Sequence, residues 1–236
     1  SINRAFFQKN KNTKEFIRIS DHIRHIISPS KTYPGIISQL PLDLLDPIIE
    51  ILADFRELIF SNIHSFQQKQ ISCAVDSMNL IALANAVRYT LVKRSDDLHN
   101  VIKEIDNIVS VCRDYSLKED LMCSLSAIYN IASYLMKLKA YDHSIHLFQI
   151  IIQLSNSKDI LLKANKQLCQ CLIAMKRTDN EEFLISLLQA KDQLSILYNL
   201  IAINPPMNPN QLTEILAKLS KQTKITNEDI RQFLPF

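Results

Sequence analysis

The chain has 236 residues, of which 47% are hydrophobic and only one is glycine, and its formal net charge is +3. A hydrophobic fraction of this size can build a sizeable core, which excludes a largely disordered chain. Tight hairpins, phosphate-binding loops and nucleophile elbows depend on glycine for positive φ or close backbone approach, and only Gly35 is present. Composition therefore predicts an all-α protein, because helices joined by short polar turns need no glycine.

The N-terminal segment is basic. Residues 1–32 carry seven lysines and arginines against two acidic residues, a net charge of +5, so the remainder is slightly acidic at −2. From Thr13 onward, five apolar residues at helical spacing predict a first helix: Phe16, Ile19, Ile23, Ile26 and Ile27. The sequence SPSKTYPG at 28–35 is a clear helix break. We therefore assign 1–35 as a basic lead-in and first helix.

Helical periodicity continues through most of the remaining chain. The next helix is predicted at 43–62, where Asp46-Pro47 suits an N-cap with a first-turn proline, although Asp43 is an earlier possible start. Three helix pairs follow, at 73–93 with 96–112, 118–138 with 141–155, and 158–176 with 180–191. Shorter helices are predicted near 192–202, 209–221 and 226–233. This order divides the chain into a helical-repeat array at 36–203 and a C-terminal helical cap at 204–236.

Three of the predicted helices end alike. Each ends in two apolar residues and a lysine, at Lys93, Lys137 and Lys176, and the lysines are 44 and 39 residues apart. A short polar turn follows, and then an acidic residue is expected to accept N–H groups at the start of the next helix: Asp96, Asp142 and Asp179. A period near 40 with two helices per unit indicates a helical repeat array.

The central pair resembles a tetratricopeptide unit, with the best match at 128–156. Ala132 occupies the small-residue position of the first helix, Tyr141 the aromatic turn position, Ser144 the helix crossing, and Phe148 the following aromatic position. The usual turn glycine is absent, and Ile151 replaces a small residue. The resemblance implies a right-handed α–α superhelix, a tetratricopeptide-like solenoid of about 9–11 helices. A weaker likeness is to the helical-repeat region of proteasome-lid and signalosome-type subunits.

Two histidine pairs, His22/His25 and His143/His146, have the i, i+3 spacing that places both imidazoles on one helix face. Zinc needs three or four ligands, and catalytic helices use i, i+4 spacing with an intervening Glu, so neither pair predicts a metal site.

The five cysteines lie inside apolar periodic segments. The Cys169-Gln-Cys171 spacing is not that of a zinc knuckle or a redox pair. We therefore predict buried free thiols in a reducing compartment, either cytoplasmic or nuclear.

No catalytic motif is present. The sequence contains neither GxGxxG nor a Walker A loop, and no nucleophile has a neighbouring glycine turn or a base in readable register. Acidic pairs such as Glu119-Asp120 and Glu181-Glu182 fall at helix starts, where the helix dipole explains them. We predict a non-enzymatic protein without a metal or a cofactor. We see no signal-peptide pattern and no uncharged apolar run long enough to span a membrane, so no membrane partner is expected.

The leading functional hypothesis is a protein–protein interaction scaffold, a subunit of a multiprotein complex that binds a partner peptide or helix along a groove. The groove is expected to be lined by polar or amphipathic residues of the first helix of each pair: Asn79, Asn85, Arg88, Tyr89, Tyr129, Asn130, Tyr134, Lys166 and Gln170. The alternative is a nucleic-acid-associated assembly subunit that uses a basic patch near Phe6, Phe7 and Phe16. That patch comprises Lys9, Lys11, Lys14, Arg18 and Arg24.

Overall fold

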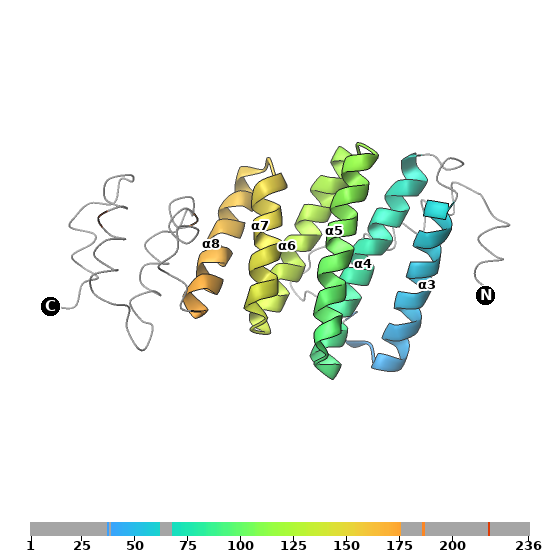
Figure 1. The fold of residues 1–236 in the computed structure, drawn as a ribbon, viewed down its shortest axis with the longest axis horizontal. Coiled ribbons are helices and arrows are strands. Elements are labelled where there is room, and N and C mark those ends of the chain that lie inside the picture. The colour runs from blue at the N-terminus through green and yellow to red at the C-terminus, as the bar shows by residue number, and fades with distance from the viewer. Residues whose placement is uncertain (1–36, 38, 62–67, 176–185, 187–216, 218–236) are drawn as a thin grey trace. The chain divides into compact units, whose positions relative to one another are not determined.

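The computed structural model describes residues 37, 39–61, 68–175, 186 and 217. Six helices and no strand are present in this part of the chain, which confirms the all-α prediction for it (Figure 1). The helices are α3 (Leu42–Ser61), α4 (Gln68–Val92), α5 (Ser95–Asp114), α6 (Lys118–Lys137), α7 (Tyr141–Leu154) and α8 (Lys158–Ala174). Most of their bounds agree with the predicted ones to within two residues, but α4 begins five residues early. The helix predicted before 36 lies outside the described residues, and of those predicted after 176 only residues 186 and 217 are described.

The chain divides into two compact units, Ser1–Leu138 and Lys139–Phe236. The first contains α3 to α6 and the second contains α7 and α8. The division at Leu138 falls within the predicted array 36–203, in the turn between α6 and α7. The predicted boundaries at 35 and 203 lie among residues whose structure is not described.

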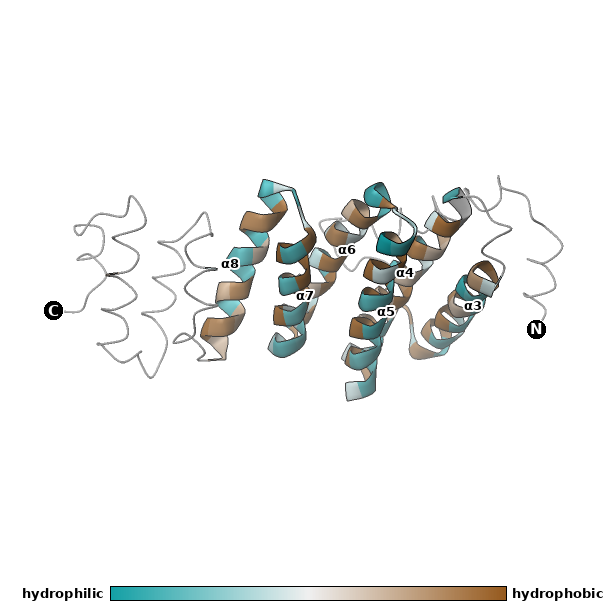
Figure 2. Ribbon diagram, turned by 45° about the horizontal axis from the view of Figure 1, so that its top comes forward, coloured by the Kyte–Doolittle hydropathy of each residue, from teal (hydrophilic) through white to brown (hydrophobic). Residues whose placement is uncertain are grey.

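Helix α4 is the centre of the first unit. It packs against α3, α5 and α6, and every residue from Cys73 to Val87 is buried. A helix that is buried on all sides needs no amphipathic stripe, and α4 has none in its sequence. Helix α5 has one buried face, formed by Leu98, Val101, Ile105, Ile108 and Cys112. Figure 2 shows the matching alternation of hydrophilic and hydrophobic residues along α5.

Two apolar clusters show that α4 runs antiparallel to both α3 and α5. At the N-terminal end of α4, Cys73 and Ala74 pack with Phe55 and Ile59 near the C-terminal end of α3. A second cluster joins the same end of α4 to the C-terminal end of α5, through Ile71, Val75, Met78, Ile108, Cys112 and Leu117. Burial of these side chains supplies the main favourable free energy of the unit, about 1.5–3 kcal/mol for each large aliphatic or aromatic group.

Polar side chains join α4 to α6. Asn79 donates from Nδ2 to Ser124 Oγ at 2.8 Å, and Ser72 Oγ donates to Asp120 Oδ2 at 2.9 Å. Farther along, Tyr134 is hydrogen-bonded to the Thr90 hydroxyl. Residue numbers rise together along both helices, so α4 and α6 are parallel.

Three turns place a non-glycine residue in the left-handed region: Lys93 at φ 56°, Ser116 at φ 53° and Lys139 at φ 64°. Each follows the C-terminal end of a helix, where glycine is usually preferred for this conformation. The next helices begin without side-chain caps at Arg94, Leu117 and Ala140.

The predicted starts of α3, α5 and α7 agree with the structure to within one residue, but the positions of three acidic residues in these helices differ from the expected caps. Asp96 and Asp142 lie in the first turns of α5 and α7 and are not the N-cap residues of these helices. Their carboxylates are still favourably placed in the field of the helix dipole. Asp46 and Pro47 lie inside α3, because the helix starts at Leu42, close to the earlier start at Asp43. Asp46 is thereby available for a tertiary contact.

The second unit has an apolar core of its own between α7 and α8, which pack against each other. Phe148, Ile151, Leu168 and Leu172 are all at most 1% exposed. Ser144, expected at a helix crossing, is fully buried and donates from Oγ to the Ala140 carbonyl at 3.0 Å.

All five cysteines are free, as predicted, and Cys73, Cys112, Cys169 and Cys171 are buried. Cys123 is exposed, contrary to the prediction of burial, because it lies on the outer side of α6. No helix within the described ranges is long and apolar enough to cross a membrane.

Candidate functional site: an acidic cleft between α3 and α5

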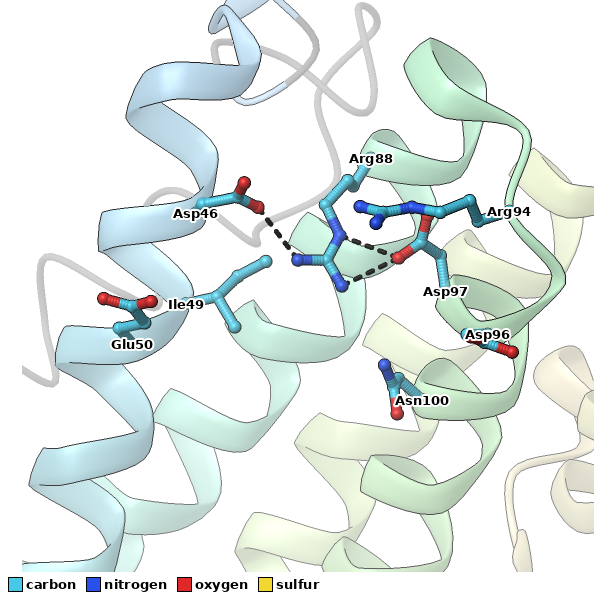
Figure 3. A pocket seen from close by; sticks show the side chains of 8 residues that line it. All are labelled: Asp46, Ile49, Glu50, Arg88, Arg94, Asp96, Asp97 and Asn100. Carbon is cyan, nitrogen blue, oxygen red and sulfur yellow. Dashed lines mark hydrogen bonds and ion pairs between the residues drawn. The ribbon is translucent and has the colours of Figure 1, made fainter.

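A cleft of about 430 Å³ lies where the N-terminal parts of α3 and α5 flank the last turns of α4. Figure 3 shows α3 on one side, α5 on the other, and the Arg88 side chain between them. Eight residues line the cleft: Asp46, Ile49, Glu50, Arg88, Arg94, Asp96, Asp97 and Asn100. We refer to this set as the acidic cleft.

Arg88 joins three helices at the base of the acidic cleft. Its Nε and Nη2 atoms both lie 2.7 Å from Asp97 Oδ1, and Nη1 lies 2.8 Å from Asp46 Oδ1. Burial by itself would lower the pKa of the Arg88 guanidinium. The hydrogen bonds and negative charges of Asp46 and Asp97 outweigh burial, so the pKa is raised. Arg88 therefore stays charged and fixed in orientation.

Only one of the two carboxylate oxygens of Asp97 accepts a hydrogen bond. The residue is 1% exposed, and its Oδ2 atom has no hydrogen-bond partner, while both contacts with Arg88 reach Oδ1. A buried charged oxygen without a donor is unfavourable by about 1–3 kcal/mol or more. This oxygen is shielded from solvent, so a ligand in the cleft reaches the exposed carboxylates of Glu50 and Asp96 instead.

The charges of the cleft favour a cationic ligand. Four carboxylates and two arginines line it, which gives a net charge of −2. Asp46 and Asp97 are already paired with Arg88, whereas Glu50 and Asp96 are exposed. A cleft lined mainly by one sign of charge attracts ligands of the opposite sign.

A second ion pair ties α3 to α5 farther from the cleft. Arg56 of α3 donates from Nη1 to Oε1 of Glu104 on α5, and Glu104 is 9% exposed. Its Oε2 atom has no hydrogen-bond partner. The Arg56–Glu104 pair and the contacts of Arg88 connect α3 to α5 at two different positions along these helices. The two walls of the cleft are thereby held in place.

The structure describes each of the predicted groove residues within its own unit. Only Arg88 lines the acidic cleft. Asn79 and Asn85 are 2% and 3% exposed, and each donates from Nδ2 to a carbonyl of the preceding turn, so neither offers its side chain to a partner. Their polar character serves packing within α4. The groove prediction therefore rests on the remaining residues.

Those remaining residues are half-buried and lie on α4, α6 and α8. Lys93 Nζ lies 5.0 Å from the centroid of the Tyr89 ring, a cation–π contact at the end of α4. Tyr129, Asn130 and Tyr134 lie on α6, and burial raises the pKa of the Tyr134 phenol although its hydrogen bond with Thr90 acts in the opposite direction. Lys166 and Gln170 lie on α8 in the second unit.

The basic patch, Lys9, Lys11, Lys14, Arg18 and Arg24, lies outside the described residues, as do His22 and His25. In the second unit, His146 is exposed and His143 is half-buried. No group of three or more His, Cys, Asp or Glu side chains able to hold a metal ion occurs in the described ranges.

Sequence reasoning missed seven of the eight cleft residues. Asp46 and Asp96 were assigned to helix starts because acidic residues are common there, and Asp97 was not distinguished from them. The available signal was Arg88 itself, a charged residue directly after the long apolar run of α4. A charge in that position needs a buried counter-charge, although its identity depends on tertiary packing.

No family model matches the chain, and neither a curated protein nor a solved structure matches it.

Proposed function

We propose that this chain is a non-enzymatic helical scaffold, a subunit of a multiprotein complex, that binds a basic peptide or helix of a partner protein in the acidic cleft. The observation that carries this proposal is the charge of the cleft, which four carboxylates and two arginines line, with the carboxylates of Glu50 and Asp96 exposed. An arginine or lysine side chain of a partner would form ion pairs with these two exposed carboxylates.

The alternation of helix directions from α3 to α6 supports a repeat architecture. Helices α3 and α5 are parallel, and the ion pair between Arg56 and Glu104 joins them. Helices α4 and α6 are also parallel, and the hydrogen bond between Asn79 and Ser124 joins them. We propose that the array continues as a right-handed α–α superhelix of the tetratricopeptide-like kind, in the cytoplasm or nucleus. Such an array provides extended surfaces for partners without reactive groups.

The test compares two charge reversals that are matched in position. Asp96 and Glu119 are both exposed second residues of a helix, in α5 and α6, so reversal to Lys has the same effect on the helix dipole. Partners of the wild-type chain are identified by affinity purification and mass spectrometry, and the affinity of each is then measured for Asp96→Lys and Glu119→Lys. We expect Asp96→Lys to weaken binding of a basic partner about tenfold or more, and Glu119→Lys to leave it unchanged. Equal affinities, or the repeated absence of a stoichiometric partner, would contradict the proposal.

The second candidate is a nucleic-acid-associated subunit, favoured by the +5 charge of residues 1–32. Its signature is a steep fall in affinity for DNA or RNA with rising salt, because binding releases counterions. Replacing Lys9, Lys11, Lys14, Arg18 and Arg24 with Gln should then abolish binding and its salt dependence. A chain that binds neither DNA nor RNA at low salt excludes this candidate.

A further inference from the structure

The outer surface of α3 carries a stripe of exposed apolar side chains. Leu44 and Ile51 are 50% and 42% exposed, and half-buried Ile48 lies between them. Their spacing of i, i+4, i+7 places the three residues on one face of the helix, which we call the apolar flank. The other exposed large hydrophobic side chains among the described residues, Leu91 and Tyr115, lie apart, at the C-terminal ends of α4 and α5. Neighbouring apolar side chains that stay exposed on a protein surface mark a contact site.

Acidic residues lie beside the apolar flank. Helix α3 carries five acidic residues and one arginine, a net charge of −4. Three of the acids, Asp43, Glu50 and Asp54, follow one another at one and two helical turns and form a stripe next to the flank. Glu50 belongs both to this acidic stripe and to the lining of the acidic cleft. The acidic stripe therefore lies between the apolar flank and the acidic cleft, and all three surfaces share α3.

The two stripes together define the chemistry of a partner. The apolar flank requires apolar side chains, and the acidic stripe beside it requires lysine or arginine. Nucleic acids and membranes with anionic headgroups carry negative charge, so α3 repels both. An extended peptide gains its main-chain hydrogen bonds at the edge of a sheet, and the described part of the chain contains no strand. A helix, by contrast, matches the spacing of the flank with the same spacing of its own apolar residues.

We propose that the partner segment is an amphipathic basic helix whose apolar face packs on the apolar flank of α3. Its apolar residues recur at i, i+4 and i+7 and cover Leu44, Ile48 and Ile51. Lysines or arginines beside that face pair with Asp43 and Glu50. This choice of partner rests on the proposed function, because Glu50 brings the same basic segment to the acidic cleft. It adds the helical form of the segment and the apolar surface that binds it.

The test uses two synthetic peptides of about 15 residues with identical composition, built from leucine, lysine, alanine and glutamine. In the amphipathic peptide the leucines recur at i, i+4 and i+7 with lysines beside them, and in the scrambled peptide the leucines are distributed around the helix. Both peptides have the same charge, so attraction to the acidic cleft alone does not distinguish them. We expect the full chain to bind the amphipathic peptide about tenfold more tightly or better, measured by fluorescence anisotropy at physiological salt.

Two leucines with almost equal exposure give matched variants, Leu44 at 50% on the apolar flank and Leu91 at 49% near the end of α4. Leu44→Asn should lower the affinity for the amphipathic peptide about tenfold and remove its advantage over the scrambled peptide. Ile51→Asn should act in the same way, and Leu91→Asn should leave both affinities unchanged. Circular dichroism checks that each variant is folded. Equal affinities of the wild-type chain for the two peptides, no binding of either, or equal losses in Leu44→Asn and Leu91→Asn would overturn the proposed contact.

A further variant separates binding at the flank from binding at the cleft. Asp96→Lys alters the acidic cleft and leaves the apolar flank intact. If Asp96→Lys weakens the binding of both peptides while Leu44→Asn has no effect, the cleft binds a basic partner and the flank does not. If neither variant changes binding, the proposed function fails as well. Sedimentation of the chain without peptide tests a second copy as the occupant. A wild-type dimer that Leu44→Asn converts to a monomer would assign the flank to self-association and contradict the proposed partner.

Discussion

At the residue scale, Arg88 shows how one charge is stabilised unequally by two partners. Asp97 has a 1% exposed side chain, whereas the side chain of Asp46 is 44% exposed. Water screens an exposed ion pair and leaves it worth about 1 kcal/mol or less, whereas an unpaired buried charge is strongly unfavourable. The two contacts with Arg88 therefore have different energetic weight although their lengths are similar.

We expect Arg88→Met to lower the free energy of unfolding by about 3 kcal/mol, because it leaves the buried Asp97 carboxylate without a counter-charge. Asp46→Asn should lower it by less than about 1 kcal/mol. Urea unfolding followed by circular dichroism measures both. Similar losses for the two variants would show that Asp97 is solvated or has another partner.

The left-handed residue Ser116, at φ 53°, offers a stabilising substitution. Ser116→Gly should raise the free energy of unfolding by about 1 kcal/mol, since glycine adopts this conformation without the steric strain of a Cβ atom. Ser110→Gly, the same change inside α5, should lower it by about 0.5 kcal/mol. Thermal or urea unfolding should show that the two variants change the free energy of unfolding in opposite directions. A loss of stability in both variants would exclude strain at Ser116.

We expect the cysteines to differ in reactivity because four of them are buried and one is exposed. Burial is the main reason that the pKa values of Cys112 and Cys171 rise to about 12, so both remain thiols at pH 8. We expect a thiol reagent at pH 8 to label the exposed Cys123 rapidly and the four buried cysteines only after unfolding. Because the folded pKa lies above the unfolded value of 9.0, the two thiols contribute stability fully below about pH 9. This contribution is lost progressively as the pH rises toward 12. Rapid native labelling of Cys112 would contradict its burial.

At the element scale, α4 combines a fully buried stretch from Cys73 to Val87 with several polar side chains. Asn79 and Asn85 each donate to a carbonyl within α4, and the Oδ1 atom of each has no hydrogen-bond partner. Only Asn79 also reaches another helix, through Ser124 of α6. A buried side-chain hydrogen bond between helices contributes about 1 kcal/mol and fixes their register.

A double-mutant cycle isolates that bond. We expect Asn79→Ala and Ser124→Ala to show a coupling energy of about 1 kcal/mol in urea unfolding. The matched pair Asn85→Ala and Ser124→Ala should show almost none, because Asn85 donates within its own helix. Equal coupling in the two cycles would mean that Ser124 does not hold α6 in register through Asn79.

At the scale of the whole molecule, the chain consists of two compact units, each with a buried phenylalanine in its core. Phe55 is 2% exposed in the first unit, and Phe148 is fully buried in the second. Removing such a ring costs about 3–5 kcal/mol of local stability. Units with separate cores are able to open separately.

We expect Phe148→Ala to accelerate amide hydrogen exchange in α7 and α8 far more than in α3 to α5. Phe55→Ala should have the reverse effect. Mass spectrometry of peptides from each helix measures both patterns. Uniform acceleration along the whole chain in both variants would show that the molecule opens as one cooperative unit.

The sequence by itself determined where the helices lie. Apolar periodicity, the long apolar run of α4, polar turns and the near absence of glycine are local properties, and they predicted α3 to α8 and the all-α class of the described chain. The exception was the start of α4, where the polar residues before Ile71 carry no apolar signal.

Only the tertiary structure decided which polar side chains form ion pairs and hydrogen bonds with one another. Arg88 pairs with Asp97, which lies 9 residues away in the sequence, and with Asp46, which lies 42 residues away. No local sequence pattern indicates either pairing. The same packing buried Asn79 and Asn85 and brought four carboxylates and two arginines to one cleft. Which charged side chains form ion pairs depends on which helix faces are in contact. Those contacts are determined by the packing of α3, α5 and α6 around α4.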